Sequence, residues 1–345
     1  MRTILYSSIW LLCICSLPLQ AQTVKSFELN EQLMSVSSLD RWELMDIVPL
    51  SFKTYHTQGM LKIGDTFYLT AVRVTRPPKY KGKGRNRTVQ DEGAGIGYLF
   101  HFDQKGNLIK QTELGEGAAF HPGGMDYDGQ YIWIPITKYY PYSESIIVRV
   151  DPMTLEVEKM ATIDDSIGAI IHDTDNQTLI GMNWDAREFL YWPLNQQKEI
   201  IHPEKKAAEL QVSNKQSSLA IQDAKYIGQN QLLGFGLTNL GNGKRIGGFE
   251  IRDTRNQAVL HQLPLSLKTT KGIFMTNNPC TVEKTPKGLR FYFIPEDNLS
   301  TLYIYTYYIS LGRENFFPGQ GDEMKCPQNL LQQTFGGHFT SNFFY

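Results

Sequence analysis

Short runs of apolar residues, separated by glycine, aspartate and asparagine turns, recur along most of the chain. Residues 60–63 and 66–72 are rich in β-branched and aromatic side chains and flank Gly64-Asp65, a dipeptide typical of hairpin turns. A second pair of such runs flanks Asp128-Gly129. Residues 203–210 are the one short segment whose pattern suggests a helix. The pattern therefore predicts an all-β fold made of antiparallel hairpins.

The hairpins recur at a regular spacing, which predicts a repeat architecture. A polar residue precedes the first hairpin of each repeat, at positions His56, His121, His172, Gln222 and Asn278. The underlying period is about 50 residues, because the longest interval contains an insertion at residues 75–95. Four strands fit into a repeat of that length, as in a propeller blade. We expect a β-propeller with five countable four-stranded blades, and the chain length is compatible with up to seven.

The two ends of the chain need separate explanations. Residues 42–52 are predicted to form a strand that closes the ring onto the last blade. At the N-terminus, Arg2, an apolar run at residues 4–17 and the small residue Ala21 form the pattern of a secretory signal peptide. No later segment approaches the ~20 apolar residues that a membrane helix needs. We expect cleavage after residues 1–21, a single propeller domain at 22–345, and a secreted or periplasmic protein without a membrane span.

The cysteines fit an oxidising compartment. Cleavage would remove Cys13 and Cys15 and leave Cys280 and Cys326 in the mature chain. Because disulfides persist in secreted proteins, we predict that these two cysteines form one. Two unrelated buried thiols are the alternative.

Charge narrows the class of partner. The chain has 34 Lys+Arg against 35 Asp+Glu, which argues against a dedicated nucleic-acid binder. Residues 76–87 nevertheless carry six positive charges, including Lys81 and Arg85, in a glycine-rich segment. Such a loop is either simply solvated or attracts an anionic ligand to the channel mouth. The partner we expect is an anionic glycan, bound by a monomer.

The polar residues of the repeats are candidates for a site in the channel. His56, His121 and His172 would line it if they occupy equivalent positions, and imidazole suits proton transfer or metal binding. Asp173, Asp223 and Asn278 would add the oxygen ligands that calcium prefers, so a Ca²⁺ ion in the propeller centre is the cofactor to be expected. The alternative is that these side chains are structural.

Further candidates lie near aromatic residues. Arg187 follows Trp184 and could hold a carboxylate, or stack on the neighbouring indoles. Tyr139 and Tyr140 form an aromatic loop that could stack on sugars or cover a blade edge. His101 lies on an expected strand, 20 residues before His121. The chain has no P-loop, dinucleotide fingerprint, hydrolase nucleophile elbow or His-Glu-x-x-His motif.

One block of sequence carries a family resemblance. His121-Pro-Gly-Gly-Met-Asp-Tyr-Asp-Gly-Gln-Tyr-Ile-Trp-Ile-Pro, together with His56-Thr-Gln-Gly and Asn183-Trp-Asp-Ala-Arg, resembles a secreted propeller family of largely unknown function. It is also similar to propeller polysaccharide lyases that cleave rhamnose–glucuronate linkages, as in ulvan and gum arabic. A weaker similarity, in Thr57-Gln-Gly-Met, is to five-bladed glutaminyl cyclotransferases.

The lyase resemblance implies specific roles. It implies a histidine pair, matched by His101 and His121, a carboxylate-neutralising arginine, matched by Arg187, and in some members a central calcium ion. His121 would be the general base, and His101, His172 or Tyr139 the acid. The sequence therefore predicts a polysaccharide lyase that acts by β-elimination. The alternatives are a non-catalytic propeller that binds glycans or proteins, and a cyclotransferase-like or hydrolytic enzyme.

Overall fold

The structure is a computed structural model in which the chain divides into two units, Met1–Ile309 and Ser310–Tyr345. All described residues lie in the first unit, between residues 29 and 308, with gaps at 38–41, 82–87, 215–216 and 287. Within the described part, no helix is both long and apolar enough to cross a membrane. The signal peptide and Cys326 lie outside the described residues, so the cleavage site and the disulfide stay predictions.

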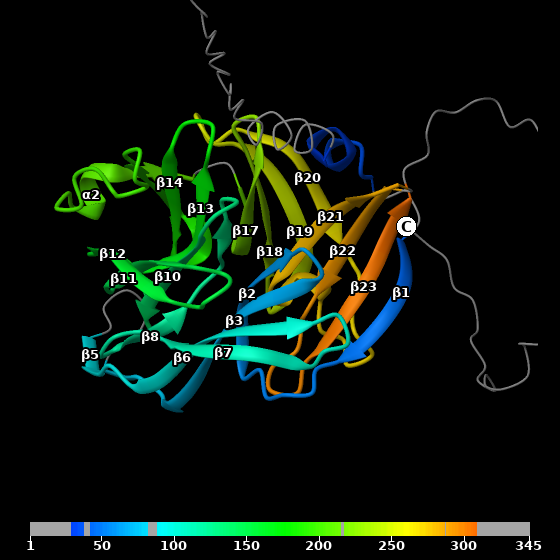
Figure 1. Cartoon of the computed structure of the whole chain (residues 1–345), viewed down its shortest axis with the longest axis horizontal. Helices are drawn as coiled ribbons and strands as arrows, with labels where there is room; N and C mark the ends of the chain where they lie inside the picture. The colour runs from blue at the N-terminus through cyan, green and yellow to red at the C-terminus, as the bar shows by residue number, and fades with distance from the viewer. Residues whose placement is uncertain (1–28, 38–41, 82–87, 215–216, 287, 309–345) are drawn as a thin grey trace, which may run out of the picture. The chain divides into compact units, whose positions relative to one another are not determined.

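Five antiparallel sheets form the blades of a β-propeller, which confirms the predicted fold and blade number (Figure 1). The first three blades, from the inner strand outward, are as follows. Blade 1 contains β2 (His56–Ile63), β3 (Thr66–Arg76), β6 (Ala94–Asp103) and β7 (Leu108–Leu114). Blade 2 contains β8 (Ala119–Pro122) with β9 (Asp126–Tyr127), then β10 (Ile132–Lys138), β11 (Ser145–Val150) and β12 (Val157–Ile163). Blade 3 contains β13 (Ile167–Asp173), β14 (Thr178–Asn183), β15 (Glu188–Pro193) and β16 (Gln211–Ser213).

The last two blades complete the ring. Blade 4 contains β17 (Leu219–Gly228), β18 (Gln231–Gly241), β19 (Lys244–Asp253) and β20 (Val259–Leu265). Blade 5 contains β21 (Cys280–Thr285), β22 (Gly288–Phe293), β23 (Thr301–Tyr308) and β1 (Trp42–Pro49). Outside the blades are the hairpin β4 (Lys79–Lys81) and β5 (Thr88–Asp91), the short helices α2 (Ala207–Leu210), η2 (Trp184–Ala186) and η3 (Met275–Asn277), and a helical segment at 29–34.

Blade 5 joins the two ends of the described chain. The early strand β1 is its outermost strand and pairs antiparallel with β23, as Figure 1 shows for the blue and orange strands. The ring of Trp42 lies 4.7 Å from that of Phe291 and 5.3 Å from that of Tyr307. This pairing confirms the prediction that a strand within residues 42–52 closes the ring.

Apolar side chains fill the spaces between neighbouring blades. Strand side chains alternate between the two faces of a sheet, and every blade is covered on both faces, so most side chains of the middle strands are apolar. Between blades 4 and 5, for example, Phe235, Phe249 and Phe291 are fully buried. Similar clusters lie between the other pairs of blades. These layers hold the blades at the spacing that brings the inner strands together.

Close contacts between the backbones of neighbouring blades explain the glycines of the His-Pro-Gly-Gly block. A Cβ atom on Gly123 would lie 2.1 Å from the carbonyl oxygen of Gly168 in blade 3. A Cβ atom on Gly124 would lie 2.8 Å from the carbonyl oxygen of Gln222 in blade 4. Only glycine lets these backbones approach so closely. The residues between β8 and β9 therefore lie directly against the inner strands of blades 3 and 4.

Buried charged side chains connect the inner strands of several blades next to these glycines. The Asp223 carboxylate accepts hydrogen bonds from the backbone N–H groups of Met60 at 3.0 Å and Met125 at 3.3 Å. Lys225 Nζ donates to Asp223 Oδ1 at 2.5 Å and to the carbonyl of Met125 at 2.8 Å. Burial raises the pKa of the Asp223 carboxyl, and the ammonium of Lys225 opposes that rise. These contacts link blade 4 to blades 1 and 2.

A second buried carboxyl, Asp126, lies nearby and should make stability depend on pH. Its Oδ2 atom accepts hydrogen bonds from the backbone N–H groups of His172 and Tyr226, both at 3.1 Å. Burial raises the pKa of Asp126 to about 7, although Lys225 and the N–H donors act in the opposite direction. In the unfolded chain the carboxyl ionises near pH 4. Protonated Asp126 therefore stabilises the fold fully below about pH 4, and this stabilisation is lost as the pH rises through 7.

We expect the free energy of unfolding to fall between pH 4 and pH 7, by up to about 4 kcal/mol from this group. Asp126→Asn keeps an acceptor for the two N–H groups and cannot ionise, so it should remove most of this slope. Urea unfolding of both proteins from pH 4 to pH 8 measures the difference. An equally steep decline in the variant would show that Asp126 is not its source.

Candidate functional site

The beginnings of the inner strands gather at one end of the channel. Inner strands of a propeller run in the same direction, as the parallel bridge between Gly124 and Ala169 indicates. The second strand of each blade is antiparallel to the first, so it ends where the inner strand begins. Side chains at these two kinds of position therefore meet at one end, which we call the upper end.

A pocket of about 140 Å³ lies at the upper end. Blades 1 to 4 all contribute to its wall. It is lined by His56, Gln58, His121, Thr137, Tyr139, Gly168, Trp184, Ile221 and Gln222. Four of the residues that the sequence singled out, His56, His121, Tyr139 and Trp184, are thus brought together.

His56 is held between a carboxylate and an amide. Its Nδ1 atom lies 3.0 Å from Asp297 Oδ1, and its Nε2 atom lies 2.7 Å from Gln58 Nε2. Because an amide NH₂ group only donates, Nε2 of His56 is the acceptor and Nδ1 carries the proton toward Asp297. This is the arrangement in which a carboxylate orients an imidazole for proton transfer.

Asn278 explains why Asp297 is held toward His56. Its Nδ2 atom donates to Asp297 Oδ1 at 3.1 Å and to the backbone carbonyl of Pro295 at 3.0 Å. Asn278 precedes β21 and Asp297 follows β22, so both come from the upper end of blade 5. The amide therefore fixes the loop that carries the carboxylate.

His121 and Tyr139 line the pocket as a stacked pair. Their ring centroids are 4.6 Å apart, and His121 lies 6.0 Å from His56 and 6.4 Å from Trp184. Burial, followed by the neighbouring His56, lowers the pKa of His121 to about 3, so it is neutral at physiological pH. Burial raises the pKa of Tyr139, with a further contribution from Asp297, so its phenol keeps its proton. His121 is only 7% exposed, and its Nε2 has no hydrogen-bond partner among the described residues.

Comparison with known proteins places the chain in a family. Residues 9–310 match "Family of unknown function (DUF6454)". The chain belongs to this family. No curated protein matches the chain.

The solved structures that the chain resembles are distant from it in sequence. A hypothetical protein from Leishmania major is 11% identical, covers 83% of this chain and 94% of its own, and has a TM-score of 0.48. The catalytic domain of a GH62 α-L-arabinofuranosidase from Coprinopsis cinerea is 9% identical, with 79% and 98% covered and a TM-score of 0.44. A calcium-binding protein, regucalcin, from Agrobacterium tumefaciens is 11% identical, with 76% and 93% covered and a TM-score of 0.42.

The structure does not bring His101 to the pocket of this DUF6454 protein. Strand β3 lies between the strands that carry the two histidines. His101, on β6, pairs with Tyr68 of β3, and His56, on β2, pairs with Val72 of β3. Four residues of strand separate the two levels, roughly 13 Å. The ring of His101 stacks on Tyr68 at 4.4 Å, and its Nε2 lies 2.9 Å from Thr66 Oγ1. His101 and His121 therefore do not form the pair that the lyase resemblance implies.

Arg187 also does not line the pocket. Its guanidinium donates to the backbone carbonyls of Ser217 at 3.0 Å and Leu219 at 3.2 Å, where the chain passes from blade 3 to blade 4. Trp184, three residues earlier, does line the pocket. Trp184 begins the short helix η2 and Arg187 follows its end. This turn directs the indole to the pocket and the guanidinium to the connection between blades 3 and 4.

His172 lies deeper in the ring than the sequence predicts. It is fully buried at the far end of β13, and Gly168, four residues earlier, is the residue of that strand at the pocket. His172 Nδ1 lies 2.9 Å from Asp128 Oδ2, which also accepts hydrogen bonds from Lys198 and from the indole of Trp133. Burial raises the pKa of Asp128, but these three donors outweigh it and hold the pKa well below its usual range. His172 therefore joins blades 2 and 3.

The predicted calcium ligands do not form one site. Asp173 accepts from the backbone of Asp175 and Asn176 and from Thr254, which fixes a hairpin turn. Asn278 orients Asp297, and Asp223 is already neutralised by Lys225 at 2.5 Å. No group of three or more histidine, cysteine, aspartate or glutamate residues in the described part could hold a metal ion. The donor set does not fit a calcium ion.

The remaining candidates lie around the pocket or outside the described residues. Tyr140 donates to Glu92 at 2.7 Å, and burial, followed by this carboxylate, raises the tyrosine pKa. Lys81 is exposed on β4, and Arg85 lies outside the described residues. The thiol of Cys280 is buried and donates to the carbonyls of Met275 and Asn278.

The sequence missed Gln58, Gln222 and, above all, Asp297. Gln58 follows His56 by two residues in His-Thr-Gln-Gly, so the alternation of strand side chains could have placed both on one face. Gln222 appeared only as a repeat position. Asp297 is 241 residues from His56 in sequence. The only feature of the sequence that could have indicated it is the turn-like Pro-Glu-Asp-Asn after an apolar strand.

Proposed function

We propose that the protein is a secreted polysaccharide lyase that cleaves uronate-containing glycans by β-elimination at the upper-end pocket. One observation carries the proposal: His56, which is paired with Asp297, and the protonated Tyr139 line the same pocket. Proton abstraction with departure of an oxygen requires a base and an acid within one pocket. The roles differ from those inferred from sequence, because His56 replaces His121 as the base.

The chemical step uses these groups as follows. His56 Nε2, once a sugar displaces the Gln58 amide, takes the proton from C5 of the uronate. The electron pair forms the C4–C5 double bond, and the C4–O4 bond breaks. Tyr139 gives its proton to the departing oxygen, and the imidazolium later returns a proton to the tyrosinate. The products are an unsaturated uronate and a shortened chain with a new hydroxyl group.

The other pocket residues support this assignment. Trp184 offers an apolar face of the kind on which sugar rings stack, and the amides of Gln58 and Gln222 can donate to a uronate carboxylate. His121 is neutral and so adds no positive charge beside the base. It can donate to or accept from a hydroxyl group.

Hydrolysis is less well supported. Glycoside hydrolases generally use two carboxyl groups on either side of the bond. The described residues that line the pocket include no aspartate or glutamate. The acid and base groups are instead imidazole and phenol, which suit proton transfer at carbon and oxygen.

A second candidate is a non-catalytic glycan-binding propeller. The position of Arg187, held by two backbone carbonyls and away from the pocket lining, favours it, because a lyase needs to stabilise the charge that develops on the uronate. In that case the His56–Asp297 pair would bind hydroxyl groups.

The two candidates differ in a direct assay. We expect that incubation of the mature protein with a panel of uronate polysaccharides, including rhamnose–glucuronate chains, raises the ultraviolet absorbance of unsaturated uronate. Calorimetric titration with the same panel should detect binding. Binding without any absorbance change would reject the lyase and support the binding protein, and failure of both would reject both candidates.

A further inference from the structure

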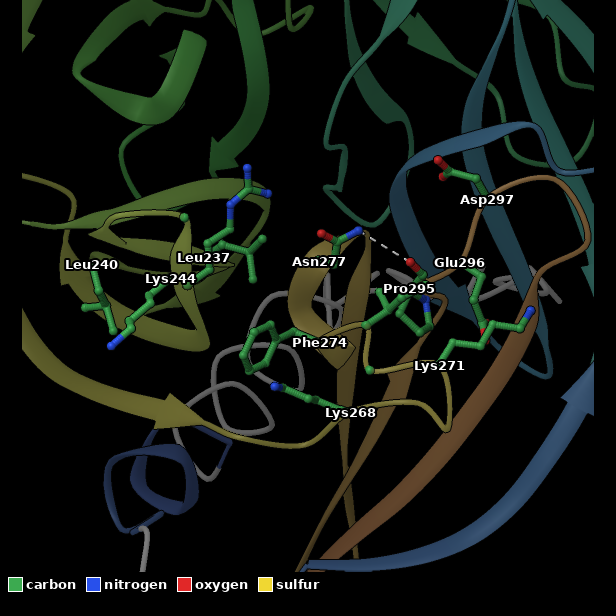
Figure 2. A pocket seen from close by; sticks show the side chains of 14 residues that line it. Leu237, Leu240, Lys244, Lys268, Lys271, Phe274, Asn277, Pro295, Glu296 and Asp297 are labelled. Carbon is green, nitrogen blue, oxygen red and sulfur yellow. Dashed lines mark hydrogen bonds between the residues drawn. The ribbon is translucent and has the colours of Figure 1, made fainter.

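A second hollow, with a volume of about 920 Å³, lies at the upper end beside the pocket. Blades 4 and 5 form it from the β18–β19 hairpin, the loop before β21 and the loop after β22. In Figure 2, Leu240 and Lys244 lie on one side, Glu296 and Asp297 on the other, and Lys268 and Phe274 between them. We call this hollow the basic groove.

The basic groove concentrates positive charge on a nearly neutral chain. Lys244, Arg245, Lys268 and Lys271 line it, and none of them forms an ion pair with a carboxylate among the described residues. Lys268 Nζ lies over the ring of Phe274 at 4.2 Å from its centroid. Four cations along one hollow attract an extended ligand with several negative charges more strongly than a small anion with one charge. Each further charge on the ligand can interact with another cation.

The opposite wall carries two carboxylates, those of Glu296 and Asp297. Glu296 is only 6% exposed, and its Oε1 atom accepts from Tyr303 at 2.8 Å. Its Oε2 atom is buried and has no hydrogen-bond partner among the described residues. A ligand hydroxyl does not reach this buried atom, but it can donate to the neighbouring carboxylate of Asp297, whose side chain is 45% exposed. The groove therefore suits a ligand that has both anionic groups and hydroxyls, which is the chemistry of an acidic polysaccharide.

The groove and the pocket are neighbours, joined by one hydrogen bond. Asp297 lines the groove and accepts the hydrogen bond from His56, which lines the pocket. The groove has the size of a site for a ligand of several rings, roughly 300–1,000 Å³, whereas the pocket holds a single group. A chain lying in the groove would thus present one of its sugars to His56.

We propose that the basic groove binds several consecutive sugars of a uronate chain and delivers one of them to the pocket. The identity of the chain rests on the proposed function. The protein consequently recognises extended chains rather than single sugars or short fragments, and its affinity depends on the number of carboxylates bound.

Calorimetric titration of the full chain carrying His56→Ala tests this without turnover. The probes are oligoglucuronates of two, four and eight sugars, with glucose oligomers of the same lengths as the uncharged match. We expect affinity to rise with the length of the charged oligomers and to fall with added salt. Lys244→Gln with Lys271→Gln should weaken binding of the eight-sugar oligomer about tenfold and that of the two-sugar oligomer much less. The matched control, Lys105→Gln with Lys205→Gln, removes two exposed charges outside the groove and should change neither.

Three results would overturn the inference: equal affinity for neutral and charged oligomers, equal losses in the groove and control variants, or tighter binding of oligothymidylate than of the eight-sugar uronate. The absorbance assay separates this inference from the proposed function. Length-dependent binding that the groove variant weakens, without turnover, supports the groove and rejects the lyase. Turnover of long chains that is unchanged in the groove variant supports the lyase and rejects the groove.

Discussion

His56→Ala is expected to lower kcat/KM for a uronate substrate by about 10²–10⁴-fold, because it removes the general base. Asp297→Asn should give a smaller loss, since the imidazole remains but its Nδ1 proton no longer faces a carboxylate. Binding of the substrate should weaken only slightly in both variants. Initial rates from the absorbance of the unsaturated product, together with calorimetric affinities, give the two quantities separately.

The control for this experiment is His202→Ala. His202 is an exposed histidine of blade 3 that contacts Glu204, a carboxylate, in a surface loop. Its removal makes the same chemical change away from the pocket, so the rate should stay at the wild-type level. Full activity in a folded His56→Ala protein would exclude His56 as the base. If His121→Phe were then inactive, the base would be His121.

Asp223→Ala is expected to lower the free energy of unfolding by about 3–5 kcal/mol, because it leaves Lys225 buried without its carboxylate. The backbone N–H groups of Met60 and Met125 would lose their acceptor at the same time. The midpoint of urea unfolding should shift strongly while the slope of the transition is unchanged.

A double variant tests whether the loss comes from the unpaired charge. Asp223→Asn with Lys225→Met removes both charges and keeps an amide oxygen for one of the two N–H groups, so it should recover most of the stability lost in Asp223→Ala. A loss below about 1 kcal/mol in Asp223→Ala, or a double variant that is as unstable as the single one, would show that the pair does not hold the inner strands together.

The sequence predicted the fold well because the fold depends on local patterns. Hairpin dipeptides such as Gly64-Asp65 mark the turns within each blade, and the spacing of the repeats yielded the number of blades. The closing strand β1 was predictable because residues 42–52 have a strand-like pattern, precede the first repeat and belong to none of the five repeats. The helical segment at residues 29–34 was not predicted.

The site was predicted only in part because strand register decides which side chain reaches the upper end. The repeat alignment placed His172 with His56 and His121, whereas Gly168 is the residue of β13 at the pocket. A glycine carries no chemical signal, and a buried histidine looks like a functional one in sequence. Asp297 could not be predicted, since its contact with His56 joins parts of the chain that are remote in sequence.

The pairing of β1 with β23 also constrains how the protein folds. Trp42 at one end of the described chain lies opposite Tyr307 near the other, so the ring is completed only after almost the whole propeller sequence has been synthesised. Contacts between residues so far apart in sequence form late, because closing a long loop costs entropy before the contact forms. Until then β1 and β23 are unpaired edges that can pair with other chains. Blade 5 is therefore the step at which folding competes with aggregation.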